Sequence, residues 1–202
     1  MNWVFKRLVD KYKNEGHNYN TEINEFRCSS FDVCPRKMYY QKKYPVDPTE
    51  YVKGIFTIGH ILHKEIQEIL KDTYDCEVPV LYVDKQSDIK LIGHADLVSD
   101  NRVIDIKTVN RLPVRPYDKH HLQVNTYSYL LSKDYYGLLY VEKNTLQMRY
   151  FEYYTDEQLF KHILQKCRLV YRCIKSDELP ECIPNKLCRY CQYKEYCNEN
   201  RK

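Results

Sequence analysis

Three cysteines near the end of the chain have the spacing of metal ligands. Cys188, Cys191 and Cys197 are separated by two and five residues in the segment Cys-Arg-Tyr-Cys-Gln-Tyr-Lys-Glu-Tyr-Cys. Thiolates two residues apart converge on one centre through a tight turn, so this segment predicts a ligand knuckle for zinc or for an iron-sulfur cluster. A fourth thiolate must then come from elsewhere in the chain.

The first candidate for the fourth ligand is Cys34, and Cys182 and Cys28 are alternatives. The chain has nine cysteines, an odd number that cannot all pair within one molecule. In a reducing compartment such a number indicates metal ligation and buried thiols more than a disulfide framework. We expect the remaining cysteines to be buried as apolar residues; these are Cys76, Cys167 and Cys173.

A predicted hairpin brings together two carboxylates and a lysine. If residues 99–102 form its turn, Asp96 faces Asp105 across an antiparallel pair, at about 4.5 to 5.5 Å. Lys107 lies two residues after Asp105 and so projects from the same face of the strand. The flanking residues are apolar, so these charges are expected to be buried and to need partners or a metal ion. The competing interpretation is an ordinary polar strand face, because Asp-x-Lys is a common sequence.

Two helical motifs supply further candidates. On a predicted core helix, His63 lies at the margin of the apolar stripe, and His60 points further toward solvent. His63 is therefore the better ligand candidate, although both histidines could be surface residues. On a later helix, Gln123 and Tyr127 lie one turn apart, so both can reach one ligand.

The element order predicts a mixed sheet flanked by helices, an α/β fold, rather than a sandwich or a bundle. After a polar N-terminal arm, a helix over 55–71 carries one apolar stripe, formed by Ile55, Ile58, Leu62, Ile66 and Ile69. Strands over 76–83, 89–98 and 103–108 form a meander, and two more cover 135–141 and 146–153. Further helices are predicted over 119–132 and 156–175.

The composition is that of a globular protein, with 43% hydrophobic residues, 30% charged residues and a formal charge of +4. That charge does not identify a nucleic-acid partner. We expect most of the 21 tyrosines to pack in the interior, although some could stack on unpaired bases. Without an apolar signal core or a membrane-length stretch, the expected location is the cytoplasm, or the host cytoplasm if the chain is virus-encoded, with no membrane partner.

Taken in order along the chain, these motifs resemble the PD-(D/E)XK nucleases of the RecB and AddB type. The resemblance is greatest to their iron-sulfur branch, which includes the small CRISPR-associated adaptation exonucleases. It rests on Gly59 to His63, Gly93-His94-Ala95-Asp96, Asp105-Ile106-Lys107 and Gln123 to Tyr127, with Cys34 before them and three cysteines after. There are two departures: Asp96 follows Ala rather than Pro, and Asp105 stands where many relatives have Glu.

The resemblance assigns roles to these residues. It makes His63, Asp96, Asp105 and the Ile106 carbonyl the ligands of Mg²⁺ or Mn²⁺. It makes Lys107 the residue that positions or activates the attacking water, beside Gln123 and Tyr127. It also makes four cysteines the ligands of a 4Fe-4S cluster, namely Cys34, Cys188, Cys191 and Cys197.

The resemblance further implies a restriction-endonuclease-like core in a single domain, 1–202. The catalytic core is expected over 55–153, and the cluster-binding ends over 28–45 and 180–198. The expected activity is cleavage of single-stranded DNA from an end, 5′ to 3′, with endonuclease activity as an addition. Proteins of CRISPR adaptation, recombination or replication are candidate partners, and an oligomer is compatible with the sequence.

Two other functions remain open at the level of sequence. A zinc- or iron-sulfur-binding module could hold nucleic acid without catalysis, because four thiolates suit zinc as well as iron. A redox or iron-sulfur sensor would not need the hairpin carboxylates.

Near Cys34, the basic residues could contact phosphates or form a solvated face; these are Arg36, Lys37, Lys42 and Lys43.

Overall fold

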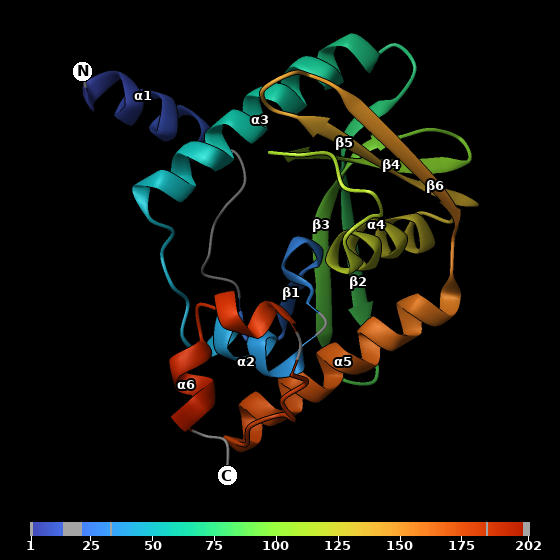
Figure 1. The fold of residues 1–202 in the computed structure, drawn as a ribbon. Helices are drawn as coiled ribbons and strands as arrows, with labels where there is room; N and C mark the ends of the chain where they lie inside the picture. Colours follow the sequence, from blue (N-terminus) through green and yellow to red (C-terminus); the bar gives the residue numbers. More distant parts are fainter. Residues whose placement is uncertain (1, 14–21, 33, 185, 200–202) are drawn as a thin grey trace.

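The computed structural model describes residues 2–13, 22–32, 34–184 and 186–199, and within them a mixed six-stranded sheet is flanked by helices (Figure 1). This confirms the predicted fold class. The strands are β1 (Glu25–Arg27), β2 (Asp75–Asp84), β3 (Ile89–Val98), β4 (Arg102–Val109), β5 (Tyr135–Glu142) and β6 (Met148–Tyr154). The meander of β2, β3 and β4 is antiparallel, as predicted, and β4 pairs in parallel with β5.

β3 is bordered differently along its two edges. β2 pairs with it over its whole length on one edge, from Asp75↔Val98 to Asp84↔Ile89. The other edge is shared, because β1 pairs only with residues 90–92 and β4 only with residues 97 and 98. Among the described residues, no strand pairs with residues 93–96 on that edge. This interval is the Gly-His-Ala-Asp motif.

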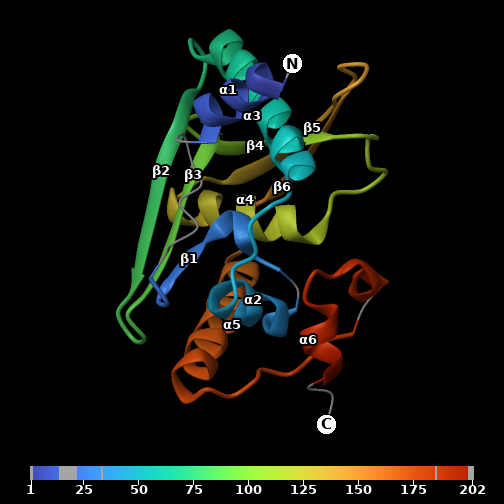
Figure 2. The same cartoon turned by 90° about the vertical axis from the view of Figure 1, so that its left-hand side faces the viewer.

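The helices are α1 (Asn2–Lys13), α2 (Pro35–Lys43), α3 (Glu50–Leu70), α4 (Asp118–Leu130), α5 (Glu157–Ser176) and α6 (Lys194–Glu199), with 3-10 turns η1 (Cys28–Ser30) and η2 (Lys186–Tyr190). In Figure 2, α3 lies toward one end of the sheet, α4 beside its middle, and α2, α5 and α6 together at the other end. None of the helices in the described ranges is long and apolar enough to cross a membrane.

The predicted polar N-terminal arm is wrong where the chain is described. The described part of this arm contains α1, β1 and α2. Residues 14–21 lie outside the described residues. Positions 33 and 185, which belong to the two predicted cluster-binding ends, also lie outside them. A three-residue strand such as β1 is too short to produce an alternating pattern. α2 begins at Pro35, and proline is favoured in the first helical turn.

The predicted apolar stripe of α3 is also wrong in its phase. Ile58 is 48% exposed and Ile69 is 76% exposed. The buried side is instead marked by Thr57, Ile66 and Gln67. The reason is a close approach at Gly59, where an added Cβ would lie 3.1 Å from Thr108 Oγ1 of β4. The helix therefore contacts the sheet through the side that carries Gly59 rather than through its most apolar side.

β4 sends alternate side chains into two different hydrophobic clusters. Val103 packs with residues of α4 and α5, whereas Ile104 and Ile106 pack with Ile66 of α3. Since successive side chains of a strand point to opposite faces, Asp105 and Lys107 project toward α4 together with Val103. The sheet thus places the charged pair on the face covered by α4.

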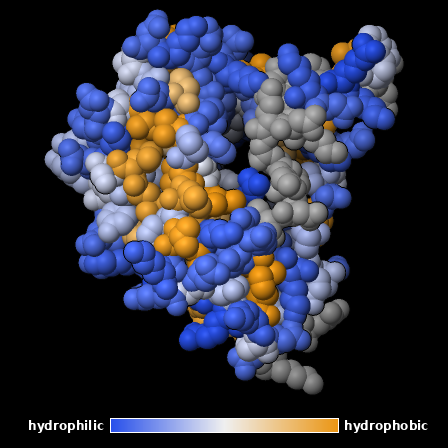
Figure 3. All heavy atoms as spheres, turned by 180° about the vertical axis from the view of Figure 1, so that it is seen from behind, coloured by the Kyte–Doolittle hydropathy of each residue, from blue (hydrophilic) through white to orange (hydrophobic). Residues whose placement is uncertain are grey.

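One outer face of the molecule carries exposed apolar side chains. Seen from behind in Figure 3, they form a band across the surface. The edge strand β2 contributes two exposed apolar side chains to the molecule's surface, Leu81 and Val83. An exposed apolar band is the natural place to test for association between chains, which stays a prediction.

Candidate active site and cysteine pocket

Asp96 lies where β3 and β4 separate. The pairs Val98↔Val103 and Leu97↔Ile104 have the predicted register, but the ladder ends there, so the predicted pair of Asp96 with Asp105 is not part of it. One position further on, Asp96 Oδ2 accepts a hydrogen bond from the Ile106 N–H at 2.7 Å. The Ile106 N–H thus donates to a side-chain carboxylate instead of to a backbone carbonyl of β3. This hydrogen bond fixes the position of the Asp96 carboxylate in the interior.

Asp105 is a fully buried carboxylate whose hydrogen-bonding capacity is not filled. It is 0% exposed, and its Oδ1 has no hydrogen-bond partner among the described residues. Lys107 Nζ lies 2.8 Å from Asp105 Oδ2 as an ion-pair contact. A buried carboxylate normally accepts several hydrogen bonds or coordinates a cation. Asp105 therefore provides oxygen ligands for a further positive charge.

Lys107 is held by α4. Its ammonium donates to Gln123 Oε1 at 2.9 Å, and Gln123 Nε2 donates to Tyr127 Oη at 3.3 Å. The structure thus joins the two predicted motifs, Asp-x-Lys and Gln-x-x-x-Tyr, in one chain of hydrogen bonds. Because Gln123 and Tyr127 are both buried, the lysine is held in a fixed orientation toward Asp105.

Gly93 leaves room for this arrangement. A Cβ at position 93 would lie 2.3 Å from Tyr127 Oη and 2.7 Å from Tyr127 Cε1. The tyrosine ring therefore lies directly against the backbone of β3, in the interval where β3 pairs with β2 on one edge only. Only glycine permits this approach without moving the ring.

His63 approaches the same site from α3. Its Nδ1 lies 3.5 Å from Asp96 Oδ2. Burial, with a smaller contribution from the charge of Lys107, lowers the pKa of His63 to about 4, so the imidazole is neutral near pH 7. A neutral imidazole is the form that binds metals. His63 therefore lies beside the carboxylates.

Burial also changes the two carboxyl groups. It raises the pKa of Asp96 to about 7 and that of Asp105 to about 6, and the charge of Lys107 opposes both shifts. One lysine thus does not compensate for the desolvation of two carboxylates. A bound divalent cation would favour the ionised forms that burial disfavours.

Two residues next to the site were missed by the sequence analysis. Gln67 Nε2 donates to the Asp96 carbonyl at 3.3 Å and to Glu77 Oε1 at 2.7 Å. Glu77 has a φ of 53°, which is unusual for a residue with a side chain, and it interrupts the pairing of β2 opposite Asp96. Gln67 follows His63 by one helical turn, and this spacing could have identified Gln67 from the sequence. No sequence signal marks Glu77.

Five thiols line one pocket at the other end of the molecule. The pocket has a volume of about 260 Å³, and its lining includes Cys34, Cys182, Cys188, Cys191 and Cys197. Cys28 is not part of this lining, because it is fully buried beside Cys167, and that burial raises the pKa of the Cys28 thiol. The alternative that Cys28 supplies the fourth ligand is therefore wrong.

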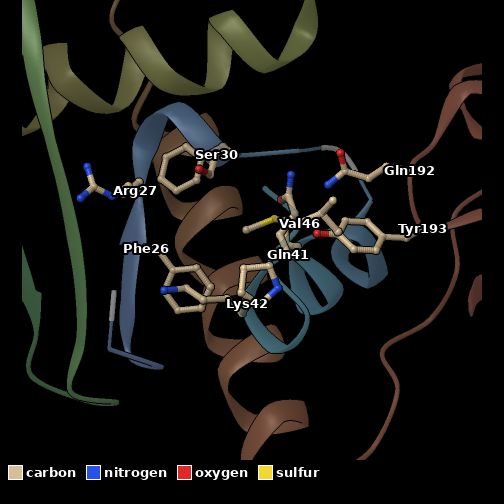
Figure 4. A pocket seen from close by; sticks show the side chains of 11 residues that line it. Phe26, Arg27, Ser30, Gln41, Lys42, Val46, Gln192 and Tyr193 are labelled. Carbon is tan, nitrogen blue, oxygen red and sulfur yellow. The ribbon is translucent and has the colours of Figure 1, made fainter. Parts of the chain in front are cut away.

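α2 connects the two ends of the chain that form this pocket. Tyr40 stacks on Tyr193 with ring centroids 5.7 Å apart, and the Tyr40 hydroxyl donates to the Tyr196 carbonyl at 3.2 Å. A smaller pocket of about 150 Å³ lies beside α2 and β1 (Figure 4), and Gln192 and Tyr193 line both pockets. The segment that carries the C-terminal cysteines is thus packed directly against the helix that follows Cys34.

The sequence profile of a nuclease family, the PD-(D/E)XK nuclease superfamily, matches residues 73–198. The chain belongs to the PD-(D/E)XK nuclease superfamily. The matched range contains the hairpin, α4 and the C-terminal cysteines, and β2 to β6 form the sheet expected of this superfamily. No curated protein matches the chain.

Solved structures show the extent of the fold. The crystal structure of SSO0001 is 21% identical, with 97% of this chain and 95% of that chain covered at a TM-score of 0.68. An alkaline exonuclease from Laribacter hongkongensis, LHK-Exo, is 11% identical over 77% of this chain and 90% of its own, at a TM-score of 0.45. A phage-related exonuclease from Haemophilus somnus 129PT is 12% identical, with 71% of this chain and 81% of that chain covered at a TM-score of 0.48. At these identities the likeness is one of fold.

The metal sites of this PD-(D/E)XK protein can be tested against its side chains. In the described part of the chain, no group of three or more His, Cys, Asp or Glu is arranged to hold a metal ion as it stands. The hairpin nevertheless fits a divalent cation in one respect: the buried Oδ1 of Asp105 has no hydrogen-bond partner among the described residues. For the pocket, the fit rests on the donor set, since five thiols surround one volume.

The basic residues near Cys34 have protein partners. Arg36 Nε donates to the Pro180 carbonyl at 2.8 Å, and Lys42 Nζ to the Glu22 carbonyl at 3.0 Å. Lys37 pairs with Asp32 at 2.6 Å, and Lys43 pairs with Asp177. The prediction that these four residues contact phosphates therefore finds no support, because their polar groups are used to hold the chain ends.

Proposed function

We propose that this protein is a metal-dependent DNA nuclease that hydrolyses phosphodiester bonds. The observation that carries the proposal is that Lys107 pairs with only one oxygen of the buried Asp105 carboxylate, beside Asp96, and leaves Oδ1 without a partner among the described residues. A structural ion pair would have its acceptors filled, whereas a metal-binding carboxylate is expected to leave them open. Membership of a nuclease superfamily agrees with this chemistry.

Asp96, Asp105, His63 and the Ile106 carbonyl would hold Mg²⁺ or Mn²⁺. When bound, the cation polarises a phosphoryl oxygen and offsets the negative charge that develops in the transition state. The hydrogen bond from Ile106 N–H to Asp96 fixes the residue whose carbonyl is the predicted ligand. The oxygen-rich ligand set, with one imidazole, suits these hard cations.

Lys107 would position the attacking water and stabilise charge at the phosphorus centre. Its ammonium is held by Gln123, so little reorganisation is needed when substrate binds. In the reaction the water oxygen bonds to phosphorus and the bond from phosphorus to the leaving sugar oxygen breaks. The attacking water releases a proton to solvent, and the leaving oxygen takes up a proton from solvent. Tyr127 acts through Gln123 and is a positioning residue.

The finer specificity follows from the family resemblance. We propose single-stranded DNA as the substrate and degradation from an end, 5′ to 3′, with endonuclease activity as a further outcome to be tested. Partners in CRISPR adaptation, recombination or replication, and a location in the cytoplasm, are predictions of the same origin.

The test is cleavage of end-labelled single- and double-stranded DNA by purified protein, with and without magnesium. Asp105→Asn should abolish cleavage, because it removes the charge that binds the cation. Asp100→Asn is the matched control, since Asp100 is exposed in the turn of the same hairpin. Binding of DNA by wild-type protein without any cleavage would instead support the non-catalytic binding module.

We further propose that Cys34, Cys188, Cys191 and Cys197 hold a 4Fe-4S cluster with a structural role. The support is that all four line one pocket formed by both ends of the chain. Iron content and an absorbance near 400 nm after anaerobic purification would test it. Stoichiometric zinc without iron would reject the cluster and favour a zinc site.

A further inference from the structure

The cysteine pocket contains one thiol more than the proposed ligand set uses. Cys182 lines the pocket, and its Sγ lies 3.5 Å from the Sγ of Cys197. The sequence suggested that Cys182 could replace Cys34 as a ligand. In the folded chain it contacts Cys197, so an exchange between these two thiols would occur at the C-terminal side of the pocket.

Cys182 is held beside the pocket by the same helix that follows Cys34. α5 ends at Asp177 in the left-handed conformation, and the chain then runs extended past Pro180. Arg36, two residues after Cys34, donates to the Pro180 carbonyl at 2.8 Å. α2 also binds the α6 segment through Tyr40 and the Tyr196 carbonyl at 3.2 Å. Both cysteines of the close pair are thus fixed to one helix.

The sulfur–sulfur distance indicates what the pair can do. With metal–sulfur bonds of about 2.3 Å, two thiolates on one tetrahedral metal ion lie roughly 3.8 Å apart. The 3.5 Å between Cys182 and Cys197 is close to that value. A metal atom bonded to one of these thiolates is therefore within reach of the other after a small side-chain rotation.

We propose that Cys182 is a fifth ligand of the cysteine pocket, interchangeable with Cys197. This rests on the proposed metal cofactor but not on its being iron, because the argument applies to zinc as well. The exchange is balanced without any oxidant: the Cys182 thiol releases a proton and its thiolate binds, while the Cys197 thiolate leaves and takes up a proton. The pocket then keeps four thiolates on its metal throughout.

The experiment compares bound metal in Cys182→Ser, Cys197→Ser and the double variant, with Cys188→Ser as a variant of another proposed ligand. Iron and zinc per chain are measured together with absorbance near 400 nm. Each of the first two single variants should keep at least half of the wild-type metal, whereas the double variant and Cys188→Ser should lose it by 10-fold or more. Cys76→Ser, outside the pocket, is the control for a cysteine change alone.

A loss of metal by Cys197→Ser as complete as that of the double variant would overturn the proposal. A second measurement avoids any folding defect of the variants: the metal-loaded wild-type protein is alkylated, and its cysteines are mapped by mass spectrometry. Cys182 and Cys197 should each be partly protected, whereas full labelling of Cys182 with full protection of Cys197 would also overturn it. Wild-type protein without bound iron or zinc is a different failure, because it would reject the proposed cofactor itself.

Discussion

The candidate active site is built from two paired strands and the helices that cover them, whereas the cysteine pocket is built from two chain ends nearly 150 residues apart. In the hairpin, backbone pairing and buried hydrogen bonds set the positions of Asp96, Asp105 and Lys107. In the pocket, the thiols are half-exposed and belong to short helices, turns and extended chain. The hairpin site is thus held by strand pairing, whereas the pocket is held by side-chain contacts between the chain ends, to which the proposed metal would add a further link.

The strongest test of this difference is Cys34→Ser. A metal that joins Cys34 to Cys188 closes a loop of about 150 residues, which in the chain-entropy model is worth on the order of 5 kcal/mol. For a chain of this size, the midpoint of thermal unfolding should fall by roughly 10 to 20 °C, with loss of bound metal. Cys76→Ser should leave the midpoint near that of the wild type, and an unchanged midpoint in Cys34→Ser would reject a stabilising role for the pocket.

The pH dependence of stability tests the buried carboxylates. When a chelator keeps the site free of metal, burial raises the pKa of Asp105 in the folded protein to about 6. The same carboxyl group in the unfolded chain has a pKa near 4. Between these two pH values the folded protein therefore holds a proton that the unfolded chain has released. The contribution of this proton to the free energy of unfolding is fully present below about pH 4. It is lost as the pH rises through 6, and the loss is up to about 3 kcal/mol.

Asp105→Asn should not show this loss of stability. The midpoint of its thermal unfolding, compared with that of the wild type at the same pH, should therefore increase between pH 4 and 7. His63, whose pKa shift has the opposite sign, is present in both proteins, but the charge of Asp105 is one cause of that shift, so the contribution of His63 cancels only in part. Magnesium should restore wild-type stability at pH 7, because it binds the ionised carboxylates. A midpoint difference that does not change with pH would show that Asp105 is not destabilised by burial.

Lys107→Ala should reduce the single-turnover cleavage rate by about 10² or more, the range for losing one preorganised electrostatic partner. Asp96→Ala should have a similar effect. Circular dichroism should show an intact fold in both variants, because the sheet is held by pairs outside these side chains. Wild-type rates from both variants would remove the hairpin from the mechanism.

Gly93→Ala tests the close approach of Tyr127. The added methyl group must displace the ring, which should cost about 1–3 kcal/mol and disturb the link from Tyr127 through Gln123 to Lys107. Gly137→Ala is a matched control, because a Cβ there would lie 2.4 Å from Tyr150 Oη, between β5 and β6. Both variants should be destabilised, but only Gly93→Ala should also slow cleavage; equal rates would separate Tyr127 from catalysis.

The smallest effect is expected from the pair of histidines on α3. His63→Ala should weaken the activation of cleavage by magnesium, because His63 lies 3.5 Å from Asp96. His60→Ala should change it by less than twofold. Titration of the cleavage rate against magnesium concentration distinguishes the two, and the reverse order would mean that the ligand is His60.

The sequence predicted the hairpin site better than the pocket for a physical reason. Strand alternation and a short turn define the register of Asp96, Asp105 and Lys107 without knowledge of the rest of the chain. The helical spacing of Gln123 and Tyr127 is equally local. The phase of α3 was not predictable, because the approach at Gly59 overrides the apolar stripe.

The residues that escaped prediction depend on long-range packing. The left-handed conformation of Glu77 and the bond from Gln67 to the Asp96 carbonyl appear only when β2 and α3 meet. The contact of Cys182 with Cys197 requires α2 to bind the segment after α5. In the same way, no local pattern shows that Arg36 is bound to a carbonyl 144 residues away.

The position of α2 has a consequence for the order of events during synthesis. Met38, Tyr39 and Tyr40 are buried in the finished protein, and Tyr40 packs against Tyr193 and Tyr196. A ribosome makes α2 before α6, so part of this apolar surface stays uncovered until Tyr193 and Tyr196 have been synthesised. The proposed metal between Cys34 and Cys197 could likewise bind all its ligands only after that segment has folded against α2.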